Sequence, residues 1–109
     1  AKISSLKVEK ILEEQTQTMV YRIKGQVFFA SVDNLMKHID YKVDVENVRI
    51  DFSEAHIWDD SAVATIDKIV LKYREHGKQV EISGLNEDSS QLVERLGVHN
   101  KPNASLSNH

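Results

Sequence analysis

The fold is decided by the stretch VRIDFSEAHIWDDSAVATID, residues 48–67. Residues 48–52 alternate between apolar and charged side chains, with Val48, Ile50 and Phe52 on one face, which predicts a half-buried strand. A short polar loop follows, and then an amphipathic helix that begins with two carboxylates and a hydroxyl. α/β domains place functional groups at such junctions between a strand and a helix. The stretch therefore predicts a strand, a charged loop and an exposed helix N-terminus.

The helix after this loop is predicted to run from Ser61 to about His76, and Gly77 is expected to end it. Helical spacing divides its side chains into a buried stripe (Ala62, Ile66, Ile69, Val70 and Tyr73) and a wet face (Asp67, Lys68, Lys72, Arg74 and Glu75). Residues 78–83 alternate as a further strand. Because strand, helix and strand follow within a short distance, the two strands should be parallel with a right-handed crossover.

A third helix is predicted to begin at a cap on Asn86 or Asp88 and to carry apolar residues at positions 92, 93 and 96. Gly97 followed by Val98 is typical of a Schellman stop, in which the glycine takes a positive φ.

Upstream, the apolar residues between positions 3 and 12 indicate an edge strand, followed by a polar turn at residues 13–16. Residues 19–23 and 26–30 read as two strands separated by a turn at Lys24-Gly25. Ser31 is a favourable N-cap for a helix that ends near Asp40. The predicted order is β-β-β-α-β-α-β-α, an α/β fold with a mixed sheet and helices packed mainly on one face.

The length of 109 residues suits one hydrophobic core. We expect the end of a linker and an edge strand in residues 1–16, the domain itself in residues 17–99, and a disordered tail in residues 100–109, which are polar and contain one Pro. The chain does not begin with Met, which fits either removal of the initiator or a piece of a longer protein.

The net charge of −3 argues against nucleic acid as a main partner, because binding phosphates requires a basic surface. No apolar run reaches the roughly 18 residues that span a bilayer. The absence of cysteine excludes disulfides and thiolate metal sites.

Asp59, Asp60 and Ser61 are the first candidates for a site. One interpretation is helix capping, because an acidic side chain accepts backbone N–H bonds and negative charge is stabilised at a helix N-terminus. One cap is sufficient, however, so a second interpretation is a polar surface presented to a partner. Ser61 is the candidate for phosphorylation, although the two neighbouring carboxylates would repel a phosphate there.

Catalytic and metal-binding interpretations have little support. His56, Asp59 and Ser61 could be read as a nucleophile, base and orienter, but the sequence has neither a G-x-S-x-G elbow nor a glycine-rich oxyanion loop. The five histidines are scattered without metal-binding spacing, so we expect no metal site and no enzyme. No nucleotide-binding motif is present either; we expect no cofactor and leave weak nucleotide binding in a loop crevice open.

The aromatic residues give two further alternatives. Phe28 and Phe29 are adjacent, so in a strand they would point to opposite faces. Trp58 lies in the loop just before the carboxylates. It is expected either to cover the core as a lid over the sheet edge or to face a partner as an interface anchor.

Together, the element order, residues 48–53 and the segment Trp58-Asp59-Asp60-Ser61-Ala62 resemble a STAS domain, the module shared by SulP-type anion transporters and bacterial anti-sigma-factor antagonists. The resemblance covers roughly residues 19–98. Residues 25–31, GQVFFAS, look like the transporter branch. Asp60 falls where antagonists carry the serine that a kinase phosphorylates, so this chain departs from the antagonist pattern there; Ser61 falls on the next hydroxyl position.

The resemblance implies a non-catalytic regulatory domain of a SulP-type sulfate or anion transporter, placed at the cytoplasmic face of the inner membrane as a soluble part of an integral membrane protein. Trp58, Asp59, Asp60 and Ser61 would form its partner-docking loop. The implied partners are the transmembrane domain of the same transporter, a second copy in a homodimer, or a cytosolic regulatory protein. The alternative is a free-standing anti-sigma-factor antagonist or stress-signalling scaffold.

Overall fold

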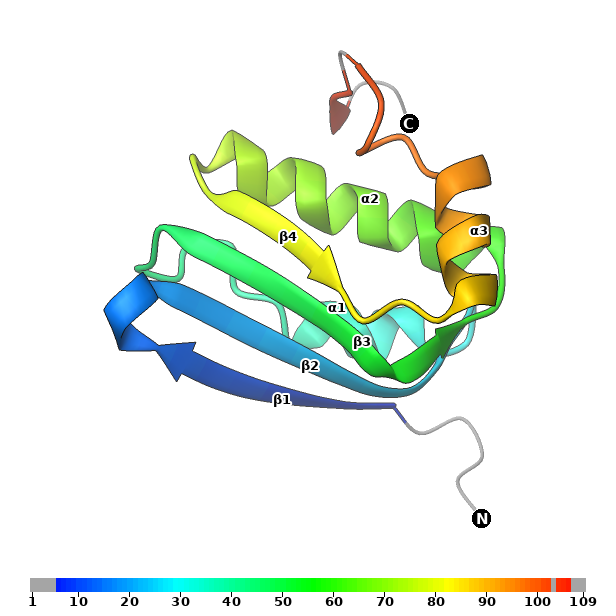
Figure 1. Ribbon diagram of the computed structural model, residues 1–109, viewed down its shortest axis with the longest axis horizontal. Coiled ribbons are helices and arrows are strands. Elements are labelled where there is room, and N and C mark those ends of the chain that lie inside the picture. Colours follow the sequence, from blue (N-terminus) through cyan, green and yellow to red (C-terminus); the bar gives the residue numbers. More distant parts are fainter. Residues whose placement is uncertain (1–5, 103, 107–109) are drawn as a thin grey trace.

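The computed structural model describes residues 6–102 and 104–106 (Figure 1). Along the chain the elements are β1 (Leu6–Glu13), the short 3-10 helix η1 (Glu14–Thr16), β2 (Thr18–Val27), α1 (Val32–Lys37), β3 (Asn47–Ile57), α2 (Asp60–Glu75), β4 (Gln79–Ser83) and α3 (Glu87–Leu96). The predicted linker end at residues 1–5 lies outside the described residues. The predicted edge strand is β1, and the predicted polar turn is η1.

The four strands form one mixed sheet in the order β1-β2-β3-β4. β1 is antiparallel to β2, whereas β2, β3 and β4 are parallel to one another. Figure 1 shows α1 behind the sheet, α2 alongside β4, and α3 at the carboxyl end of the parallel strands. Tyr21, Ile50 and Phe52 face the helices and are almost fully buried. The predicted fold class, a mixed sheet with helices mainly on one face, is confirmed.

The other face of the sheet carries charged side chains. Arg22 lies 3.3 Å from Asp51 and 3.6 Å from Glu9. Arg49 lies 3.0 Å from Glu13. Partly exposed ion pairs of this kind contribute little free energy each, about 0–1 kcal/mol, but they suit a face that meets solvent. Burying this face under a helix would require desolvating them all.

β3 continues past the predicted strand 48–52 and includes residues that the sequence suggested as a loop. Arg22 pairs with Asp51 and Lys24 with Glu54, so β3 contains one extra residue between these pairs, a β-bulge. The bulge shifts the alternation of side chains by one residue. Ile57 therefore enters the core, with 2% exposure, although it lies an odd number of residues after Phe52. This change of phase is why residues 53–57 did not show a strand pattern.

Polar contacts hold the bulge. The Asp51 carboxylate accepts hydrogen bonds from the Ser53 backbone N–H (2.8 Å) and from Arg22 Nε (3.3 Å). Burial alone would raise the pKa of Asp51, but these hydrogen bonds and the Arg22 charge outweigh it and hold the pKa below its ordinary value. Gly84 packs against the bulge and has a φ of +76°. A Cβ at this position would lie 2.6 Å from the Ser53 backbone nitrogen.

The expected turn at Lys24-Gly25 is wrong. The two predicted strands are one strand, β2, which pairs with β1 on one side and β3 on the other through this position. Gly25 has a φ of +116° and remains within the strand. The chain turns only after Val27, so Phe28 and Phe29 lie in a turn and not in a strand. The order is therefore β-β-α-β-α-β-α.

The first helix is shorter than predicted, because α1 ends at Lys37 instead of near Asp40. Ser31 precedes it but makes no side-chain cap. Its hydroxyl donates instead to Gln26 O (2.7 Å) and accepts from the Phe28 N–H (3.1 Å). Ser31 thus closes the turn between β2 and α1.

Buried tyrosines attach the segment after α1 to α2. The Tyr73 hydroxyl donates to Asp40 O (2.8 Å) and lies 3.0 Å from the Tyr21 hydroxyl. Burial, with the Tyr21 contact, raises the pKa of Tyr73 well above its ordinary range. The hydroxyl donates to Asp40 O and so joins the segment after α1 to α2.

The predicted second helix is α2, and its apolar stripe is buried as expected. Asp67 is an error of the sequence analysis, because it is 1% exposed and not on a wet face. Its carboxylate accepts the backbone N–H groups of Val98 (3.0 Å) and His99 (3.1 Å). The chain after α3 covers this part of α2, which a helical pattern cannot reveal.

The predicted Schellman stop at Gly97 is also wrong. Gly97 has φ −72° and ψ 155°, an extended conformation, and the next residues run on to Asp67. Gly97 is needed for space and not for a positive φ: a Cβ would lie 2.5 Å from Val93 O. Of the tail predicted to be disordered, residues 100–102 and 104–106 are described, and residues 103 and 107–109 lie outside the described residues. The disorder stays a prediction.

We predict that Gly84→Ala destabilises the domain by about 3 kcal/mol, because it combines a strained positive φ with a clash against the β3 bulge. Gly77→Ala is the matched control. Gly77 has nearly the same φ, +77°, but no heavy atom within 4 Å of an added Cβ, so only about 1 kcal/mol of backbone strain is expected. Urea unfolding of both variants measures the difference; equal losses would contradict the proposed clash with the bulge.

Candidate functional site

The candidate site lies where the parallel strands end. The turn after β2, the residues between β3 and α2, and the N-terminal ends of α2 and α3 gather at this end of the sheet (Figure 1). β1 begins there as well, because Leu6 pairs with Gly25 near the end of β2. The four predicted site residues, Trp58, Asp59, Asp60 and Ser61, lie at this junction, and each has a different environment.

Asp59 is the N-cap of α2 and uses both carboxylate oxygens. Oδ1 accepts the Ala62 N–H (2.9 Å), and Oδ2 accepts the Phe29 N–H (2.9 Å). The first bond caps α2, and the second ties the turn after β2 to the beginning of that helix. Asp59 is therefore a structural residue, and both of its oxygens serve the backbone.

Asp60 and Ser61 form the first turn of α2, and both are exposed. Asp60 is the acidic residue of that turn, where the helix dipole favours negative charge. Since Asp59 already caps the helix, the carboxylate of Asp60 and the hydroxyl of Ser61 are presented to solvent. The capping interpretation therefore holds for Asp59, and the surface interpretation fits Asp60.

Two large aromatic side chains flank Asp59. Phe29 is 70% exposed and Trp58 is 59% exposed. The expectation that Trp58 covers the core is wrong: the bulge in β3 places Ile57 inside and Trp58 outside. We call Phe29, Trp58, Asp60 and Ser61 the docking surface.

The backbone under the docking surface is well held. The Trp58 N–H donates to Val27 O (3.0 Å), and the Phe29 N–H donates to Asp59. The indole N–H of Trp58 donates to Gln26 Oε1, and the His56 ring lies 4.1 Å from the Trp58 ring. The Phe29 ring packs edge-to-face against the Phe28 ring, with 5.4 Å between the ring centroids. Exposed aromatics on a fixed backbone lose little entropy on binding, which suits an interface anchor.

Phe29 and Gln26 also belong to this site, although their sequence positions alone do not single them out. The Phe28-Phe29 pair predicts a strand, whereas the structure has a turn there. Two adjacent aromatics just before Ser31 were the available signal, and the turn that exposes one of them depends on bonds to residue 59, thirty residues away.

The structure does not form the catalytic arrangement that His56, Asp59 and Ser61 could suggest. His56 Nδ1 lies 2.9 Å from Asn86 Nδ2, and the Asp59 oxygens accept backbone N–H groups. Asn86 is itself the cap of α3, through its bond to the Ser89 N–H (2.8 Å). Within residues 6–102 and 104–106, no group of three His, Asp or Glu side chains is close enough to hold a metal ion.

A recess of about 240 Å³ lies beside Trp58, against α3. Asp88 and Arg95 are its charged residues, and Leu92 is apolar. It provides space next to the docking surface. Weak nucleotide binding in such a crevice stays a prediction.

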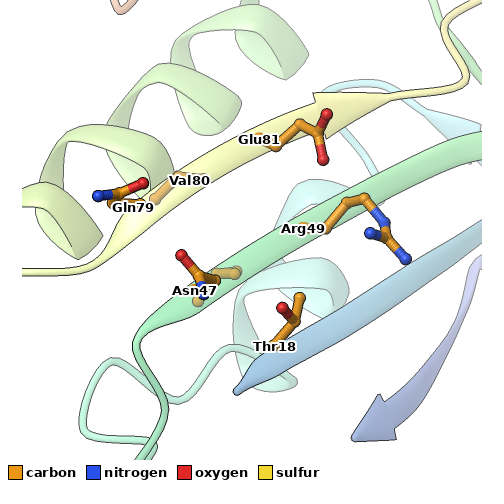
Figure 2. Close-up of a pocket in the computed structure, with 7 residues that line it drawn as sticks. Thr18, Asn47, Arg49, Gln79, Val80 and Glu81 are labelled. Carbon is orange, nitrogen blue, oxygen red and sulfur yellow. The ribbon is translucent and has the colours of Figure 1, made fainter. Parts of the chain in front are cut away.

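A second hollow lies far from the docking surface, on the charged face of the sheet (Figure 2). It has a volume of about 320 Å³ and is lined by Thr18, Asn47, Val48, Arg49, Gln79, Val80 and Glu81. The Arg49 guanidinium points toward β2, away from Glu81 (Figure 2), and pairs with Glu13 at 3.0 Å. The positive charge of Arg49 in this hollow is therefore already paired with Glu13. The docking surface remains the stronger candidate for the functional site.

We predict that Asp59→Ala destabilises the domain by about 1–2 kcal/mol, because it removes the α2 cap and the bond to the Phe29 N–H. Asp60→Ala, the adjacent control, should cost less than about 1 kcal/mol, since it removes only the interaction with the helix dipole. Thermal and urea unfolding compare the two variants. A loss for Asp60→Ala equal to that for Asp59→Ala would show that the two carboxylates share the cap.

Comparisons with known proteins agree with this architecture. The family model for the STAS domain matches residues 9–109. The "Putative sulfate transporter YbaR" of Bacillus subtilis is 47% identical over 96 residues, which cover 88% of this chain and 20% of that protein. The chain therefore spans about one fifth of the length of this relative. Among the helices of the described residues, none has the length and apolar character needed to cross a membrane.

Solved structures give the same assignment. A crystal structure of an anti-sigma-factor antagonist STAS domain from Rhodobacter sphaeroides is 40% identical, with a TM-score of 0.68 over 72% of this chain and 86% of that one. A variant of RsbS from Moorella thermoacetica has a TM-score of 0.66 over 90% of this chain and 84% of that one, but at 15% identity it shows the fold alone. The resemblance drawn from the sequence is confirmed, and the chain belongs to the STAS domain family.

Proposed function

We propose that this STAS domain is a non-catalytic, regulatory interaction module of a SulP-type sulfate or anion transporter. The similarity to YbaR along most of the chain supports this class of protein. In this proposal the domain lies at the cytoplasmic face of the inner membrane, as residues 17–99 following a linker end and an edge strand. Its partners are the membrane domain of the same transporter, a second copy of the chain, or a cytosolic regulator, and no cofactor takes part.

The docking surface carries the proposal through one observation: Phe29 and Trp58 are 70% and 59% exposed on a backbone that hydrogen bonds fix. Large aromatic side chains are the usual anchors of protein interfaces. The exposed carboxylate of Asp60 and hydroxyl of Ser61 would add polar contacts at the rim. Asp59 would contribute indirectly, by holding the two aromatic residues in place.

We predict that Trp58→Ala weakens binding of the chain to the membrane domain by about tenfold, as expected for loss of an interface anchor. Asp60→Lys should weaken binding through charge reversal and change anion uptake in the full-length transporter. Glu75→Lys is the control, because Glu75 is also an exposed acid on α2 but lies at the far end of the helix.

Binding is measured by titration of the purified domains, uptake with labelled sulfate in membrane vesicles, and folding by circular dichroism. If folded Trp58→Ala and Asp60→Lys variants bind and transport like the wild type, the docking surface has no role in this function.

The second candidate is a free-standing anti-sigma-factor antagonist, favoured by the 40% identity with the Rhodobacter sphaeroides domain. That function would rely on phosphorylation, and Ser61 is the exposed hydroxyl at the first turn of α2. The neighbouring Asp60 carboxylate would repel the phosphate.

Incubation with a cognate anti-sigma kinase, followed by mass spectrometry, tests this candidate. For a transporter domain we expect no phosphate on Ser61. Phosphate on wild-type Ser61, absent from a Ser61→Ala variant, would favour the antagonist.

A further inference from the structure

The recess beside Trp58 has the size and lining to receive a side chain of a partner. Ile57, Trp58 and Leu92 supply its apolar lining, and its volume is about 240 Å³. An apolar cavity of about 150 Å³ already holds a benzene ring. The recess therefore has room for one large apolar side chain, next to an indole that is itself exposed.

Hydrogen bonds between the end of β3 and the start of α3 fix the shape of this recess. The Ile57 N–H donates to the buried Ser89 hydroxyl (3.0 Å), which joins the strand to the first turn of the helix. Beside this bond, His56 Nδ1 lies 2.9 Å from Asn86 Nδ2, and the His56 ring packs on the ring of Trp58. A recess held in this way needs little reordering when a side chain enters it.

The surroundings of Trp58 and of the recess are acidic. α2 and α3 begin at the same end of the sheet (Figure 1), α2 with Asp60 and α3 with Glu87 and Asp88. All three acids are exposed, and Asp88 lines the recess itself. The helix dipole favours acids at these positions, but it leaves their charge open to a partner. Among the residues that the structure describes, no Lys, Arg or His nitrogen lies within 4.0 Å of these carboxylates.

The acids on the open face of the sheet have a different environment. Glu9 and Asp51 both pair with Arg22, at 3.6 Å and 3.3 Å, and Glu13 pairs with Arg49 at 3.0 Å. That face therefore supplies its own counter-charges, whereas the helix starts beside Trp58 do not.

The cation that lines the recess does not change this picture. Arg95 follows Asp88 by seven residues, which places it about 10 Å further along α3. The recess thus has an acidic end next to the docking surface and a basic end at the far side of the helix. A partner that enters beside Trp58 meets the acidic end.

We propose that the docking surface and the recess together bind a basic protein segment. One apolar side chain of this segment enters the recess beside Trp58, and Lys or Arg side chains on either side of it pair with Asp60, Glu87 and Asp88. The inference rests on the proposed function and names the chemistry of the partner. Cytoplasmic loops of membrane proteins carry an excess of Lys and Arg, so a loop of the transporter's membrane domain is the occupant that fits.

The same charges argue against two other occupants. In a symmetric dimer formed through this surface, each copy would present its acids to the acids of the other, because such an interface uses the same patch on both subunits. An anionic lipid surface attracts basic segments, and the three carboxylates would be repelled by its headgroups.

Titration of the 109-residue chain against the purified membrane domain tests the charges. The double variant Glu87→Lys with Asp88→Lys should weaken binding at least tenfold, because two attractive contacts become repulsive. Asp88→Asn, which keeps a polar helix start, should weaken binding about threefold. Glu81→Lys is the matched control and should leave binding unchanged, since Glu81 is an exposed acid on the open face of the sheet.

Salt gives a second measure of the charges. Raising NaCl from about 50 mM to about 500 mM should weaken binding of the wild-type chain about tenfold, and that of the double variant much less. Circular dichroism checks that each variant folds. Unchanged affinity in the folded double variant would overturn the inference.

Gln91→Trp tests the recess, because Gln91 is an exposed residue of α3 that lines it. An indole at this position should fill the recess and weaken binding about fivefold to tenfold. Ser90→Trp adds the same bulk to the neighbouring exposed position, outside the residues that line the recess, and should leave binding unchanged. Equal affinities of the folded Gln91→Trp variant and the wild type would overturn the entry of a side chain.

The combined outcomes separate this inference from the proposed function. If Trp58→Ala weakens binding while the variants at residues 87, 88 and 91 do not, the partner is not a basic segment and the proposed function stands. If none of the variants changes binding, the proposed function fails and the inference fails with it. Binding of the chain to protein-free vesicles of phosphatidylglycerol would assign the surface to lipid and overturn the inference.

Discussion

The β-bulge in β3 is the constraint on which the candidate site depends. One extra residue between Asp51 and Glu54 changes which side chains of the strand face inward. Without it, Ile57 would point to solvent and Trp58 toward the core. The bond from the Ser53 N–H to Asp51 and the close packing of Gly84 make this change of phase part of the fold. A local irregularity, fixed by a carboxylate and a glycine, therefore decides what the domain presents at the end of its sheet.

Asp59 then connects this strand to the rest of the site. Its two oxygens join the beginning of α2 to the turn after β2, so two segments thirty residues apart take one fixed arrangement. Asp60 is adjacent in sequence and carries the same chemical group, yet it is exposed. The neighbouring carboxylates therefore have separate roles, one in the architecture and one on the surface, and only their three-dimensional surroundings distinguish them.

Periodicity in the sequence predicted the elements whose stability is local. The alternation of residues 48–52, the apolar stripe of α2 and the cap choices at residues 59–60 and 86 or 88 all correspond to observed features. The errors fall where distant contacts override local preference. Gly25 is typical of a turn but pairs with strands on both sides. Asp67 is typical of a surface residue but is covered by Val98 and His99, which lie more than thirty positions later in the chain. The sequence left Trp58 open between a lid over the core and an interface anchor, because no sequence pattern reports the bulge that places it outside.

The course of β1 has a consequence for affinity. The strand runs antiparallel to β2 and starts at Leu6, opposite Gly25 and only a few residues from the exposed aromatic pair. A binding partner joined covalently to this strand would meet that pair as an intramolecular contact. Short flexible tethers give effective concentrations on the order of millimolar. Contacts far too weak to join separate molecules would then be occupied most of the time, and small changes in their strength would switch them on or off.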